Sequence, residues 1–119
     1  MRSTLVLGAS LSPERYANQA VRLLTHYKHP VTAVGASCGM IGDVAVLTSI
    51  PPDVAPHTIT LYINPAIQSH YREPILRCNP KRIIFNPGTE NAELAREASA
   101  AGIEVVEACT LVMLRTGQY

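Results

Sequence analysis

The chain has little net charge and no long apolar run, and each of these absences excludes a class of partner. Ten Lys and Arg are offset by nine Asp and Glu among 119 residues, so the formal net charge is only +1. A dedicated nucleic-acid binder normally carries a basic excess, so we expect no nucleic-acid partner. No apolar run approaches the ~20 residues of a membrane span, and the first apolar stretch begins too early for a signal peptide. We therefore expect a cytoplasmic protein without a membrane partner.

Cysteine is scarce as well. Cys38, Cys78 and Cys109 are odd in number and far apart, which indicates neither a disulfide framework nor a CxxC zinc or redox site. We expect reduced, mostly buried thiols and no metal site. Cys38 is open to two interpretations because it lies in a stretch of small residues. It is either a structural thiol or a group that forms a mixed disulfide with a thiol ligand.

Apolar residues are abundant and are arranged in alternating strand and helix patterns. They make up 47% of the chain, enough for one domain of residues 1–119 with a sizeable core. Strands are expected at residues 5–7, 31–34, 58–63, 81–85 and 103–107, with a brief one at 43–47, and helices at 13–28, 65–77, 90–101 and 108–114. This alternation predicts an α/β fold, a three-layer doubly wound sheet with about five parallel strands.

Several local features set the expected ends and faces of the helices. Ser12 is predicted to cap the first helix, with Pro13 as its first residue and Asn18 on its outer face. Pro74 is predicted to kink or divide the helix at 65–77. Residues 35–42 are predicted to form a loop, because they are small and rich in glycine.

The turns at the carboxyl ends of the strands are the expected ligand site, as in other doubly wound sheets. The turn from Gly8 to Ser12 offers backbone N–H groups and a helix N-terminus to an anion such as a nucleotide phosphate. Arg15 follows and could hold a phosphate in a fork, the alternative being a solvated surface charge. Glu90 and Glu93 would repel a phosphate from the turn after residue 85. The phosphates are therefore expected at the first turn.

Two common nucleotide-binding patterns are missing. A GxGxxG fingerprint and an acid after the second strand would indicate a dinucleotide, but Gly8 stands alone and Val34 leads into Gly35 without a carboxylate. A GxxxxGK[ST] phosphate loop is also absent. Binding of NAD(P) or a similar adenine nucleotide remains an alternative.

The order and spacing of several stretches resemble the small CoA-binding domain family. These stretches are the Gly8–Ser10 turn, the small-residue turn ending in Ile41 and Gly42, the Asn64-Pro65 helix start, Glu93–Ala98, Ala101–Val106 and Cys109. The family has a Rossmann-like fold, shared with the CoA-binding part of succinyl-CoA synthetase alpha subunits. The resemblance implies coenzyme A or an acyl-CoA as the ligand. It implies phosphate contacts from Gly8, Ala9, Ser10 and Arg15, adenosine contacts from Gly35, Ala36, Ser37 and Gly42, and contacts to the pantetheine arm from Ile63, Asn64, Pro65, Pro87 and Gly88.

The functional hypotheses fall into three classes. The first is noncatalytic binding of CoA or an acyl-CoA through the carboxyl-end turns. The second is an enzyme of acyl transfer or thioester chemistry, which is disfavoured because no His has a Ser, Cys or Asp partner at a motif spacing. The third is a ligand-free interaction domain, for example a homodimer with a contact at Leu111–Leu114, for which core packing is the alternative.

Overall fold

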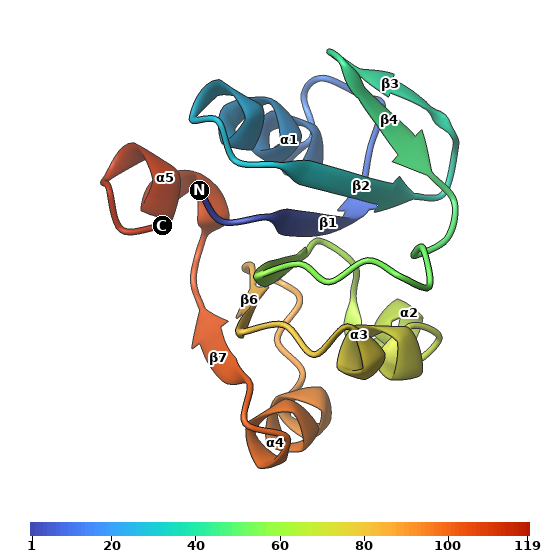
Figure 1. The fold of residues 1–119 in the computed structure, drawn as a ribbon, viewed down its shortest axis with the longest axis vertical. Helices are drawn as coiled ribbons and strands as arrows, with labels where there is room; N and C mark the ends of the chain where they lie inside the picture. The colour runs from blue at the N-terminus through green and yellow to red at the C-terminus, as the bar shows by residue number, and fades with distance from the viewer.

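One seven-stranded sheet runs through the molecule in the order β3-β4-β2-β1-β5-β6-β7 (Figure 1). The structure is a computed structural model that describes residues 1–119. Every neighbouring pair of strands is parallel except β3 and β4. The strands are β1 Thr4–Ala9, β2 Val31–Gly35, β3 Gly39–Ile41, β4 Val44–Leu47, β5 Thr58–Leu61, β6 Arg82–Phe85 and β7 Glu104–Glu107. The helices are α1 Tyr16–His26, α2 Pro65–Gln68, α3 Arg72–Cys78, α4 Ala92–Ala100 and α5 Thr110–Arg115.

Successive residues of a strand point to opposite faces of the sheet. Because the strands are apolar on both faces, helices cover both of them. Leu5 of β1 belongs to a buried cluster with Ile75 of α3 and with side chains of α4. Val6 belongs to a second cluster with Val21 of α1 and Leu114 of α5. The predicted three-layer α/β arrangement is therefore confirmed, and Leu114 packs in the core.

The strand order changes direction between β1 and β5. From β1 the chain passes through α1 to β2 and on to β4, then returns to β5 on the other side of β1. Counted along the chain, the parallel strands follow the 3-2-1-4-5-6 order of the Rossmann fold. Such a reversal leaves a crevice at the carboxyl ends of β1 and β5, where doubly wound proteins bind ligands.

The predicted loop at residues 35–42 is wrong for residues 39–41. These residues form β3, whose Met40 pairs with Ala45 of β4 in an antiparallel hairpin. Gly42 closes the hairpin with a φ of +57°, so this glycine supplies a tight turn rather than flexibility. The brief strand expected at 43–47 is confirmed as β4. No helix lies between β4 and β5, in accord with the prolines of that connection.

The first helix begins at Tyr16 rather than at Pro13. The N–H of Arg15 donates to the carbonyl of Ser12 at 3.1 Å, which makes residues 12–15 a hydrogen-bonded turn with Pro13 at its second position. Arg15 is the N-cap residue and makes no side-chain capping bond. The predicted cap at Ser12 is therefore wrong, because the proline favours a separate turn before the helix.

The helix predicted at 65–77 is divided, but not at Pro74. Asn64 caps α2 by accepting the N–H of Ile67 at 2.9 Å, so this predicted start is confirmed. The break lies at residues 69–71. Pro74 instead lies in the first turn of α3, where its missing N–H costs nothing.

The helix predicted to begin at Glu90 begins at Ala92, with Asn91 as its cap. Asn91 accepts the N–H of Leu94 at 3.1 Å. Glu90 therefore precedes the helix, and only Glu93 lies in its first turn. None of the helices combines the length and the apolar character needed to cross a lipid bilayer.

Candidate functional site

A cleft of about 410 Å³ lies at the carboxyl ends of β1, β2 and β5, where the strand order reverses. Its volume falls within the range of small-molecule sites, about 300–1,000 Å³. The cleft brings together seven of the predicted site residues, Gly8, Ala9, Ser10, Gly35, Ala36, Ser37 and Ile63. Turns that are far apart in the sequence thus form one surface.

Two glycines let the strands approach closely beneath this cleft. Gly8 has a φ of +102°, and a Cβ on it would lie 2.9 Å from the carbonyl carbon of Tyr62. A Cβ on Gly35 would lie 2.1 Å from the carbonyl oxygen of Ala9, far inside contact distance. These glycines are therefore required by the packing of β1 against β2 and β5, whatever the ligand.

The first turn is held in shape by Asn18, which was predicted to lie on the outer face of the first helix. Asn18 is only 3% exposed. Its Nδ2 donates to the carbonyl of Ser10 at 2.8 Å, and its Oδ1 accepts from Nε of Arg22 at 2.9 Å. The guanidinium of Arg22 also donates to the carbonyl of Pro13 at 3.1 Å. The helical pattern gave no signal for this role, because Asn18 faces the turn and not the sheet.

Backbone donors at the first and second turns are left without protein partners. The N–H groups of Ser10, Leu11, Ala36 and Ser37 donate to no acceptor in the chain, whereas the N–H of Ser12 donates to Oγ of Ser10 at 3.2 Å. Unpaired backbone N–H groups are the donors that bind phosphate in turns of this kind. The cleft can therefore accept an anion without a basic side chain.

Arg15 lies outside the cleft, in an adjoining pocket of about 270 Å³ that shares Gly8 and Ser10 with it. Tyr62 lines the same pocket. Its hydroxyl is buried near Thr60 and Thr110 without the geometry of a hydrogen bond, and burial raises the pKa of Tyr62 well above its usual value. The phenol therefore stays neutral, and Arg15 is the one charged group bordering this pocket.

The remaining predicted residues lie apart from the cleft. Gly42 is in the β3–β4 hairpin turn, and Asn64 caps α2. Pro65 lines a separate cavity of about 310 Å³ between α2, α3 and α4. Pro87 and Gly88 are exposed in the turn after β6, where the N–H of Gly88 donates to the Glu90 carboxylate at 2.9 Å.

Two kinds of residue at this end of the sheet were not predicted from the sequence. Leu11, Ile67 and Tyr71 add apolar walls to the cleft. Gln68, which is 1% exposed, donates to the carbonyls of Ile63 at 2.8 Å and Thr89 at 2.7 Å. It thereby ties the turn after β5 to the turn after β6. A single Gln in a short helix carries no sequence signal of such a role.

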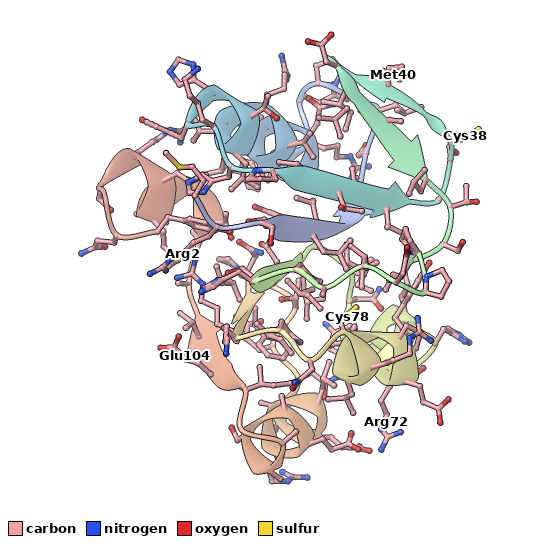
Figure 2. All side chains as sticks on the ribbon, in the orientation of Figure 1. Arg2, Cys38, Met40, Arg72, Cys78 and Glu104 are labelled. Atoms are coloured by element: carbon pink, nitrogen blue, oxygen red, sulfur yellow. The ribbon has the colours of Figure 1, made fainter.

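The cysteines differ in their surroundings. Cys38 is exposed beside the hairpin and far from Cys78 (Figure 2). Cys78 is buried, which raises the pKa of its thiol, and Cys109 is half-buried at the start of α5. All three are free thiols. The expectation of mostly buried thiols is therefore wrong for Cys38, which lies on the surface next to Ser37 of the cleft.

The same fold occurs in solved structures of widely differing sequence. An uncharacterized protein of known crystal structure is 43% identical with a TM-score of 0.96, and the match covers 100% of this chain and 98% of the other. A hypothetical protein from Pyrococcus horikoshii OT3 is 23% identical with a TM-score of 0.86, over 97% of this chain and 82% of that one. A Thermus thermophilus protein is 20% identical with a TM-score of 0.80, over 99% and 91%. The last two likenesses show the fold alone.

No curated protein matches the chain. A family model described as a CoA binding domain matches residues 2–115. That range contains every strand and helix and all residues that line the cleft. The resemblance noted from the sequence is thereby confirmed, and the chain belongs to the CoA-binding domain family.

Proposed function

We propose that the protein binds coenzyme A or an acyl-CoA in the cleft between β1, β2 and β5 and catalyses no reaction on it. The observation that carries this proposal is that a member of the CoA-binding domain family has one cleft at the point where its strand order reverses. Doubly wound folds bind nucleotides at this point.

The first turn receives the diphosphate. The unpaired N–H groups of Ser10 and Leu11 supply neutral donors, and Arg15 supplies one positive charge at the edge. Gly8 and Ala9 have no side chain large enough to obstruct the phosphates. The position of the diphosphate fixes the direction of the remaining ligand along the sheet edge.

The adenosine lies against Gly35, Ala36 and Ser37 at the end of β2. The pantetheine arm passes Ile63, and Asn64, Pro65, Pro87 and Gly88 lie farther along the same sheet edge. Ile67 and Tyr71 give this side of the cleft an apolar wall suited to the uncharged arm.

The lining of the cleft supports binding without catalysis. Ser10, Ser12 and Ser37 provide hydroxyl groups, but no His, Cys, Asp or Glu is among the lining residues. A serine nucleophile needs an adjacent base, so these hydroxyls are suited to hydrogen bonding with the ligand.

The test is a thermal-shift panel on protein that has been freed of ligand by unfolding and refolding. The panel contains CoA, acetyl-CoA, NAD, NADP, ATP and AMP. At a hundredfold excess over Kd, bound CoA should stabilise the protein by about 2.7 kcal/mol. Ser10→Trp should abolish the shift, whereas Ser99→Trp on the exposed side of α4 should retain it. Stabilisation by NAD or ATP but not CoA would indicate another adenine nucleotide, and no stabilisation by any of them would contradict the proposal.

A further inference from the structure

The cleft has no charged side chain on its walls. Its lining residues are apolar, small or hydroxylated, and none is Lys, Arg, His, Asp or Glu. Arg15 borders only the adjoining pocket. Arg72, at the same end of the sheet, lines the separate cavity and forms an ion pair with Glu97. The cleft and its adjoining pocket therefore offer one guanidinium to all the phosphates of a ligand.

The end of β2 is where the adenosine ribose lies in doubly wound nucleotide-binding folds. An acid there binds the ribose hydroxyls, and a basic residue there binds a ribose phosphate. In this chain β2 is followed by Ala36, Ser37 and Cys38, all exposed and uncharged. The only charged residue of the β3–β4 hairpin beyond them is Asp43, whose sign repels a phosphate.

Coenzyme A carries a phosphate at the ribose 3′ position in addition to its diphosphate. We infer that this cleft does not recognise the ribose 3′-phosphate, so that CoA and 3′-dephospho-CoA are equivalent ligands. The inference rests on the proposed function and defines its ligand class as an adenosine diphosphate that carries a pantetheine arm, with or without the 3′-phosphate. The 3′-phosphate projects into water, because the exposed turn after β2 offers it no cation. The unpaired N–H groups of Ala36 and Ser37 alone do not offset the cost of burying a dianion.

Calorimetric titration of the wild-type protein with both ligands tests this directly. The two Kd values should agree within about twofold, since a solvated phosphate without a nearby cation contributes little. Arg15→Ala should weaken both ligands by the same factor, because it acts on the diphosphate that they share. CoA binding tenfold tighter than dephospho-CoA would overturn the inference. If neither ligand binds, the proposed function itself is wrong. This outcome is distinct from tighter binding of CoA, which would contradict only the inference about the 3′-phosphate.

A variant that gains recognition of the 3′-phosphate provides the complementary measurement. Ala36→Lys places a cation at the exposed end of β2 and should favour CoA over dephospho-CoA by about threefold to fivefold, as expected for an exposed ion pair. Ala100→Lys, at the exposed end of α4, is the matched control and should create no preference. Equal affinities in the Ala36→Lys variant would overturn the placement of the ribose phosphate beside β2.

Discussion

At the scale of single residues, the cleft depends on positions where a side chain has no room. Gly35 is the most restricted of these, since its added Cβ would lie 2.1 Å from a backbone oxygen that cannot rotate away. Gly39 differs, because an added Cβ would meet only the flexible end of Leu11, at 2.8 Å. The same substitution should therefore have different consequences at the two sites.

Gly35→Ala should lower the free energy of unfolding by about 2 kcal/mol, because β1 and β2 must move apart to admit the methyl group. Urea denaturation measures this change. Gly39→Ala is the matched control and should cost clearly less, since the exposed Leu11 side chain can rotate. Equal losses at the two positions would contradict the argument from close packing.

Gln68 is the second residue on which the site depends. Gln68→Met keeps the approximate length of the side chain but leaves the carbonyls of Ile63 and Thr89 without their donor. We expect a loss of about 2 kcal/mol in the free energy of unfolding, typical of buried groups left unpaired. Gln19→Met, which removes an exposed hydrogen bond to the Glu14 carbonyl, should cost less than about 0.5 kcal/mol. A Gln68→Met variant as stable as the Gln19→Met variant would contradict the proposed link between the two turns.

At the scale of elements, strands were easier to predict than their connections. Apolar stretches such as Leu5–Leu7 are buried on both faces, and this property alone indicates a parallel strand. β3 was not predicted because its three residues, Gly39–Ile41, are too few to show an alternating apolar pattern and are followed at once by Gly42. The start of α1 was misplaced because Pro13 suits a turn as well as a helix start.

The hairpin gives Gly42 a structural role that can be separated from ligand binding. Its φ of +57° is costly for most residues, so Gly42→Ala should reduce the free energy of unfolding by about 1 kcal/mol. Gly42→Asn should cost less, because Asn tolerates this conformation. CoA affinity should be unchanged in both variants, since Gly42 does not line the cleft. A tenfold loss of CoA affinity measured by calorimetry would instead support the adenosine contact that the family resemblance implied.

The candidate site was only partly predictable from the sequence, because some of its walls come from elements that meet only in the folded chain. The turns after β1 and β2 were identified because small residues follow buried strands there. The apolar wall from Ile67 and Tyr71 was not, since their approach to the cleft depends on how α2 and α3 pack. Spacing along the sequence does not reveal such long-range contacts.

At the scale of the whole molecule, the two ends of the sheet differ in charge. Opposite the cleft, the Arg2 side chain donates to the main-chain oxygen of Tyr119 at 2.6 Å, and Arg2 and Glu104 lie on the same side of the molecule (Figure 2). Arg82 lies over the Tyr119 ring at 4.3 Å, and Lys81 adds a further positive charge. Both chain termini lie at this end (Figure 1). Positive charges therefore gather away from the cleft.

Two histidines at that end make stability depend on pH. Burial lowers the pKa of His29 and His57 below the ordinary value of 6.5, and nearby positive charges lower it further, with Glu104 opposing the shift at His57. The unfolded chain therefore takes up protons first as pH falls, so the free energy of unfolding should decrease below about pH 6.5. Thermal melts from pH 7.5 to 5.5 should show a falling Tm. The decrease should be smaller in a His29→Gln/His57→Gln variant, whereas His70→Gln should retain it. An unchanged slope in the double variant would contradict the assignment.

The two outer strands of the sheet have a consequence for how the protein behaves at high concentration. β3 is only three residues long, and β7 has a Glu at each end. Short or charged outer strands are poor templates for another strand, which protects a sheet from aggregation. Growth into fibrils by strand addition is therefore disfavoured, and we expect a stable assembly of two copies to use surfaces other than the two outer strands.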